Sequence, residues 1–219
     1  MAAGGLMVSD KSKINDINDL KGKKIGIAGG SIDKSWLIFR AYYQDLFGKD
    51  LRKDSEQIFG APPLLNKKIE QGSFDAILTY WPYQARLMSK DFKTIVNVTD
   101  VIGKLGIEGN IPVIGWVFRD DWAEKNSLTL QNFVKASNEA KTLMLNSDEV
   151  WDKVKPSMNV QSEATFVNLR DIYRQGIPKE SNNFNLESAS KLFSMLALIG
   201  GEELVGDSTV LSKGTFWLK

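Results

Sequence analysis

The chain has 219 residues, enough for one domain or two small lobes, and its 28 basic and 27 acidic side chains leave a formal net charge of +1. Such a small net charge gives no reason to expect nucleic acid or an anionic membrane surface as a partner. There is no cysteine and no histidine, which excludes disulfides, thiolate or imidazole metal sites, and catalysis by either side chain. An enzyme with this sequence would have to use carboxylates, lysine, tyrosine or a cofactor; we expect no catalytic residue, no metal and no cofactor.

The start of the chain carries no targeting signal. Its first six residues lack the charged and apolar regions of a signal peptide. No apolar run approaches the roughly 18–20 residues that a membrane-spanning helix needs. We expect residues 1–20 to be a lead-in loop, and the chain to be a mature form or fragment of a longer protein.

The first half predicts strands that alternate with helices, an arrangement typical of a mainly parallel sheet. Each strand is short and apolar, and most of the helices begin or end at glycine or proline. The predicted units are a strand at 24–28 with a helix from Ser31 to Phe47, a strand at 57–59 with a helix at 64–72, a strand at 74–80 with a helix at 81–88, and a further strand at 94–98.

The pattern changes after a glycine-rich loop that ends at Pro112. Residues 113–118 predict one strand, antiparallel to the earlier ones, and the remainder is helical. The predicted helices are 129–145, 149–154, 162–175 and 186–199. Because little sheet is available beneath their apolar faces, we expect these helices to pack on one another, to self-associate, or to expose apolar surface, with Phe216 and Trp217 covering part of the gap.

Two strand-to-helix junctions carry the main candidate binding residues. Gly29, Gly30 and Ser31 follow the first strand, where free N–H groups and the helix dipole suit an anionic group. The alternative is a tight turn with Ser31 as the helix N-cap. Tyr80 and Trp81 follow the third strand, at the same edge of a parallel sheet, and are candidates for an aromatic wall. The alternative for Trp81 is core packing.

The glycine turn at 26–31 matches neither the dinucleotide fingerprint nor a P-loop. Gly60 and Pro62, at the middle junction, either form only a turn or line the same site. Trp116 either faces a cleft or packs in the core.

Three carboxylates, Asp33, Asp120 and Asp121, lie near predicted strand ends. A catalytic pair is conceivable. A solvated loop for Asp120 and Asp121 and a helix-end charge for Asp33 are favoured.

The segment from Asp19 to Ile27, followed by Gly30-Ser31, resembles the opening of the second lobe in periplasmic substrate-binding proteins of ABC transporters. The similar branch is the nitrate/sulfonate/taurine (SsuA/TauA) and NMT1/THI5-like group. Residues 70–76, the pair Trp81-Pro82 and the stretch 113–122 resemble later motifs of that group. The family has a first-lobe segment before the opening motif, whereas only 18 residues precede it here.

The resemblance implies an α/β, type II periplasmic-binding-protein-like fold. Residues 1–112 would form the second, α/β lobe, and residues 113–219 the return strand and the helical remainder of the first lobe. The resemblance also implies that Gly30, Ser31, Tyr80 and Trp81 face the ligand cleft.

The leading hypothesis is a non-catalytic solute-binding component of an ABC-type importer. It would bind a small organic or anionic ligand between two lobes and deliver it to a membrane permease, in the periplasm or on an extracytoplasmic lipid anchor. One alternative is an anabolic enzyme of the thiamine-pyrimidine-precursor type, because related folds host such enzymes. The other is a ligand-sensing domain.

Overall fold

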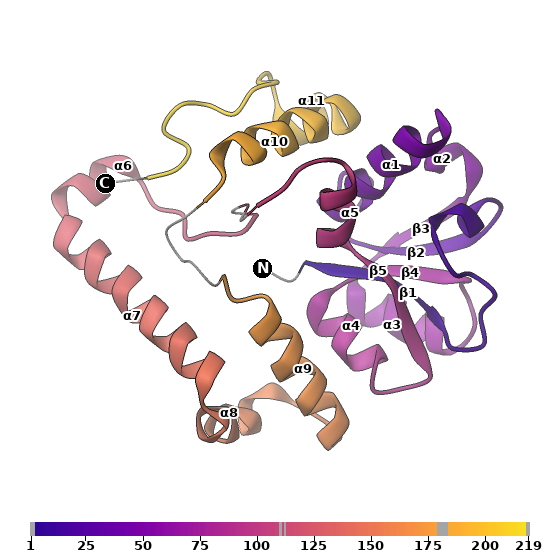
Figure 1. Ribbon diagram of the computed structural model, residues 1–219, viewed down its shortest axis with the longest axis horizontal. Helices are drawn as coiled ribbons and strands as arrows, with labels where there is room; N and C mark the ends of the chain where they lie inside the picture. Colours follow the sequence, from indigo (N-terminus) through magenta and orange to yellow (C-terminus); the bar gives the residue numbers. More distant parts are fainter. Residues whose placement is uncertain (1–2, 110, 112, 179–183, 218–219) are drawn as a thin grey trace.

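The computed structural model describes residues 3–109, 111, 113–178 and 184–217 (Figure 1). Pro112, the predicted end of the glycine-rich loop, lies outside the described residues. An α/β unit is followed by an arm of helices that leads away from it, and later helices return to pack on it. No helix in the described ranges combines the length and the apolar character needed to span a membrane.

Within the described residues, five strands form one sheet in the order β3-β2-β4-β1-β5. They are β1 (Gly4–Ser9), β2 (Lys24–Ala28), β3 (Glu56–Gly60), β4 (Ala76–Tyr80) and β5 (Phe92–Asn97). The predicted parallel pairing is confirmed, because β2 pairs parallel with both β3 and β4. The helices that connect or follow these strands are α1 (Lys34–Phe47), α2 (Leu51–Asp54), α3 (Pro62–Glu70), α4 (Trp81–Leu87) and α5 (Val98–Lys104).

The lead-in loop predicted for residues 1–20 is wrong in part, because β1 lies inside the sheet. It pairs antiparallel with β4 on one side and with β5 on the other. Two glycines make this possible. A Cβ at Gly4, where φ is +125°, would lie 2.0 Å from the Thr79 carbonyl oxygen, and one at Gly5 would lie 2.8 Å from that of Val96. After β1, the 3-10 turn η1 (Ile17–Leu20) adds buried side chains to the core.

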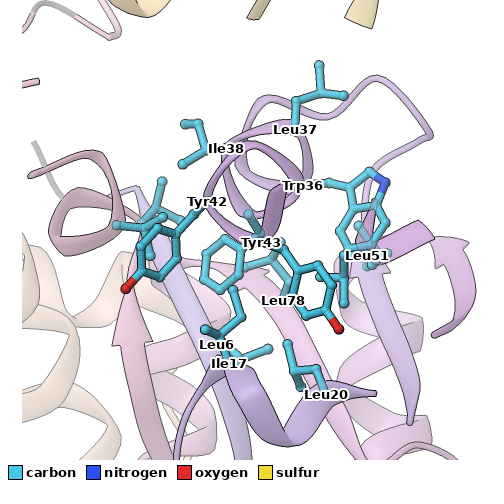
Figure 2. Close-up of a cluster of buried hydrophobic side chains, with 14 of the residues drawn as sticks. Leu6, Ile17, Leu20, Trp36, Leu37, Ile38, Tyr42, Tyr43, Leu51 and Leu78 are labelled. Carbon is cyan, nitrogen blue, oxygen red and sulfur yellow. The ribbon is translucent and has the colours of Figure 1, made fainter. Parts of the chain in front are cut away.

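The core has two layers because side chains alternate between the faces of a strand. Leu6 and Val8 of β1 face the layer formed with α1, while Met7 faces the layer formed with α3. Figure 2 shows Tyr42 and Tyr43 of α1 gathered with Leu6 and Leu78 of the sheet. The α/β unit is therefore a three-layer arrangement with helices on both faces of the sheet.

The four helices predicted after residue 120 are confirmed as α7 (Ser127–Asn146), α8 (Asp148–Val154), α9 (Glu163–Gln175) and α10 (Leu186–Gly200). Two short helices that the sequence did not predict are α6 (Asp120–Lys125) and α11 (Glu202–Val205), and the 3-10 turn η2 (Lys155–Met158) precedes α9. Two of the predicted helices return to the α/β unit: α9 packs on α4, and Leu192 and Leu196 of α10 join the core beside α1. In Figure 1, α7 stands away from the sheet.

The strand predicted at 113–118 is wrong, because no described residue of this segment pairs in a sheet. Its β-branched and aromatic side chains favour a strand, but a strand needs a neighbouring edge to pair with. Instead Trp116 packs edge-on against Phe133 of α7, and Phe118 against Trp217 of the tail. Much of this segment and of α7 is exposed apolar surface, one of the expected outcomes; the exposed large side chains include Ile114, Trp116, Val117, Leu128, Phe133 and Leu143.

Candidate functional site

The carboxyl ends of β2, β3 and β4 meet at one edge of the sheet, where α1, α3 and α4 begin. In open α/β sheets this edge is where ligands bind. The antiparallel strand β1 brings its first residues to the same place, because Gly4 is the register partner of Tyr80. The topology thus concentrates loop backbone and helix N-termini at a single edge.

The Gly29–Ser31 turn lies exposed at this edge. Gly29 has a φ of +99°, in the region that favours glycine, and its N–H donates to the carbonyl oxygen of Gly60 at 3.0 Å. This hydrogen bond joins Gly29 of the first junction to Gly60 of the second, and Gly30 and Ser31 follow Gly29 on the same exposed turn.

The N-cap of α1 is Asp33, so the alternative that gave this role to Ser31 is wrong. The Oδ1 atom of Asp33 accepts hydrogen bonds from the backbone N–H groups of Ser35 at 2.9 Å and Trp36 at 3.2 Å. Both serine and aspartate are good N-caps, and the N-cap lies two residues later than the sequence indicated. Ser31 is left exposed on the turn.

Tyr80 links the third junction to the first. Its hydroxyl donates to Oδ2 of Asp33 at 2.8 Å, and a Cβ on Gly29 would lie 2.8 Å from that hydroxyl oxygen. Burial, followed by the hydrogen bond to Asp33 and the charge of Asp33, raises the pKa of Tyr80 to about 12. The phenol therefore stays protonated at neutral pH, and its hydroxyl donates this proton in the hydrogen bond to Asp33.

The other aromatic candidates have different surroundings. Trp81 is partly buried and packs edge-on against Tyr173 of α9, with ring centroids 5.9 Å apart, so it joins α4 to α9. Trp116 donates to the Ser137 hydroxyl at 3.3 Å and keeps 61% of its surface exposed. The core alternative for Trp116 is therefore wrong, and its contacts are with α7.

Pro62 is the first residue of α3, at the same edge as Gly60. A Cβ on Gly60 would make ordinary contact with Leu65 at 3.4 Å. Both residues therefore belong to the turn that starts α3.

A polar network at the end of β5 was missed. Gln84 is buried, and its Nε2 donates to Oδ1 of Asn97 at 2.8 Å and to Oγ1 of Thr94 at 3.0 Å. Asn97 and Asp100 form a capping box at the start of α5. The spacing of these two residues signals the start of α5, whereas the contacts of Gln84 with β5 exist only in the folded sheet.

The remaining carboxylate candidates lie elsewhere. Asp120 and Asp121 are in the first turn of α6, and Asp121 pairs with Arg119 at 2.9 Å in an exposed ion pair. No group of three or more potential metal-ligating side chains occurs in the described ranges.

A sheet with helices on both faces and exposed loops at its carboxyl edge is an open α/β fold of the kind that binds ligands at that edge. The family model described as NMT1/THI5 like matches residues 2–149, and the chain belongs to this family. No curated protein sequence matches the chain.

Solved structures with the same fold include two sulfonate-binding proteins. The alkanesulfonate-binding protein SsuA from Xanthomonas axonopodis pv. citri, bound to MOPS, is 18% identical to this chain with a TM-score of 0.68. The match covers 95% of this chain and 67% of SsuA. The periplasmic aliphatic sulphonate binding protein SsuA from Escherichia coli is 21% identical with a TM-score of 0.61, covering 95% and 63%. The chain thus spans about two thirds of the length of these neighbours.

The desulfurization enzyme DSZB also has a similar fold. It is 13% identical with a TM-score of 0.53, and the match covers 91% of this chain and 70% of the enzyme. The same architecture therefore occurs in binding proteins and in an enzyme, and function has to be argued from the site.

Proposed function

We propose that this chain is the solute-binding component of an ABC-type importer and binds a small organic or anionic ligand at the carboxyl edge of its sheet. The observation that carries the proposal is the exposed Gly29–Ser31 turn beside the paired side chains of Asp33 and Tyr80. An exposed backbone turn, a hydroxyl and an aromatic side chain suffice to bind a small molecule without chemistry.

The similar structures support this role. Two of them are named as sulfonate-binding proteins, and one of these as periplasmic. We infer an extracytoplasmic location and a membrane permease as partner. Gly30, Ser31 and Tyr80 are the residues proposed to face the ligand, with residues 1–112 as one lobe and 113–219 as part of the other.

The test is calorimetric titration of the full chain with short alkanesulfonates, MOPS and carboxylates of matched length. We expect saturable binding. Ser31→Ala should weaken the affinity about tenfold, because the loss of one hydrogen bond to a charged group has this effect. Ser73→Ala, at an exposed serine before β4 at the opposite edge, is the matched control. Failure of all these compounds to bind would overturn the proposal.

The second candidate is an enzyme, favoured by the fold shared with DSZB. Since this chain has no cysteine or histidine, its own chemistry would have to come from carboxylates, tyrosine or lysine. Turnover of a bound sulfonate or sulfinate, lost in Asp33→Asn while binding persists, would favour the enzyme over the receptor.

A further inference from the structure

The N-terminus of α1 is already matched by a negative charge from the chain itself. The carboxylate of Asp33 accepts two backbone N–H groups of the first turn through Oδ1, at 2.9 and 3.2 Å. These are the donors that a helix N-terminus would otherwise offer to an anionic ligand. A sulfonate or carboxylate placed here would meet a carboxylate instead of free donors.

Tyr80 does not supply the missing donor. It has a single hydroxyl proton, and this proton is directed to Oδ2 of Asp33 at 2.8 Å. What remains available on the pair is lone-pair capacity: one further site on Oδ2 and one on the phenol oxygen. Both atoms can accept a hydrogen bond from a ligand, and neither can donate one.

The negative charge is not neutralised by a side chain. No ion pair involves Asp33 in the part of the chain that the structure describes, whereas Asp50 and Asp148 each contact two arginines. Asp33 and Tyr80 are only partly buried, and the adjoining Gly29–Ser31 turn is exposed. A solute at this edge can therefore reach an acidic, acceptor-only pair.

The contact between Asp33 and Tyr80 requires a residue without a side chain at position 29. With any side chain at this position, the Cβ would come within 2.8 Å of the Tyr80 hydroxyl oxygen and 3.2 Å of the Asp33 Cβ. The glycine thus lets the phenol and the carboxylate meet beneath the turn.

We propose that Asp33 and Tyr80 form a subsite that accepts a cationic nitrogen carrying hydrogens on the ligand, and that the anionic group of the ligand lies away from the α1 N-terminus. This inference rests on the proposed function and specifies the ligand class: small molecules bearing an amino or related group. An ammonium ion gains a charge-assisted hydrogen bond to Asp33, whereas a methyl group in its place would desolvate the carboxylate without replacing its water.

The experiment is calorimetric titration of the full chain with aminopropanesulfonate and butanesulfonate, which differ by an ammonium group in place of a terminal methyl group. We expect the amino compound to bind at least about tenfold more tightly. In Asp33→Asn this preference should fall to near unity. Asparagine is also a good N-cap, so the variant is expected to keep α1.

Asp100→Asn is the matched control, because it removes one exposed carboxylate near the same edge, and it should leave the preference intact. Equal affinity for the two compounds, or a preference that survives Asp33→Asn, would overturn the subsite but not the receptor function. Absence of binding by both compounds and by the wider sulfonate panel would overturn both.

Discussion

Arg40 of α1 and Asp50, the N-cap of α2, form a two-point ion pair, with Nε donating to Oδ1 at 3.0 Å and Nη2 to Oδ2 at 2.8 Å. Nη1 of the same guanidinium lies 3.5 Å from the carbonyl oxygen of Ile199, near the end of α10. One side chain therefore joins three helices from distant parts of the sequence. A planar guanidinium is suited to this because its donors point in several fixed directions.

Replacing Arg40 should destabilise the protein markedly. We expect Arg40→Gln to lower the free energy of unfolding by about 2 kcal/mol, because it leaves a partly buried carboxylate without its main partner. Urea denaturation measures this change. Arg52 is the control: it contacts the same Asp50 at 3.3 Å but is 58% exposed, and Arg52→Gln should cost under about 1 kcal/mol. Equal losses in the two variants would contradict the prediction.

Asp50 should also contribute to acid sensitivity. The hydrogen bond from Arg40 is the main cause that lowers the pKa of Asp50 below its ordinary 3.8, with burial opposing it. The unfolded chain then binds the proton at higher pH than the folded one. The stabilisation is present above about pH 4 and is lost as the pH falls through the lower, folded pKa.

Asp50→Asn should therefore flatten the dependence of unfolding free energy on pH below pH 4. Denaturation series at several acidic pH values would show this. A variant curve parallel to that of the wild type would contradict it.

Tyr80 should ionise unusually late. Its pKa of about 12, against the ordinary 10.0, predicts that the phenolate forms only in strong alkali. Ultraviolet absorbance measures this ionisation, and comparison with Tyr80→Phe assigns the signal to Tyr80. Asp33→Asn should lower that pKa, but not fully to 10.0, because burial is the larger cause. The folded state favours the neutral phenol, so its contribution to stability is present below pH 10 and is lost as the pH rises towards 12.

Gly4 should not tolerate a side chain. Gly4→Ala places a Cβ against the Thr79 carbonyl at a backbone angle that L-residues rarely adopt, and β1 lies between two strands that cannot both move. We expect a loss of at least about 2 kcal/mol in unfolding free energy, measured by thermal or urea denaturation. Gly103→Ala, where nothing lies within 4 Å of the added Cβ, should be neutral or slightly stabilising. An unaffected Gly4→Ala protein would show that β1 is not inserted in the sheet.

The exposed apolar surface formed by Trp116, Val117 and Phe133 should promote self-association. Val117 is 97% exposed and Trp116 61%, and burying apolar area is worth about 25 cal/mol per Å². Sedimentation velocity should show concentration-dependent association, which the double variant Trp116→Gln, Phe133→Gln reduces. Lys135→Gln, an exposed change on the same helix, should have no effect. A wild-type chain that stays monomeric and binds no hydrophobic dye would contradict the prediction.

The sequence predicted most of the α/β unit because its signals are local. Strands β2 to β5 are apolar runs with turn residues beside them, and α1 ends at Gly48, which adopts the left-handed conformation expected of a C-terminal glycine. β1 was missed because three apolar residues after two glycines carry little signal. Its place in the sheet depends on β4 and β5, which lie far along the chain.

The errors at 113–118 and at the N-cap of α1 have the same origin. Residues 113–118 have strand-forming side chains, but a strand forms only where another strand presents an edge. Ser31 and Asp33 are equally good caps on local grounds, and the hydroxyl of Tyr80, 47 residues further on, lies beside Asp33 only once the sheet has formed. The contact between Trp81 and Tyr173 likewise forms only when α4 and α9 have packed together.

The return of α10 to the sheet has a consequence for biosynthesis. Leu192 and Leu196 complete the same core layer as Leu6, so every residue from Leu6 to Leu196 must leave the ribosome before that layer can close. Until then, the face of α1 that packs on α10 stays exposed to solvent or bound to a chaperone. Contacts between residues so far apart in the sequence slow folding and extend the lifetime of aggregation-prone intermediates. The first and last thirds of this chain should accordingly reach their native state together, as one cooperative event.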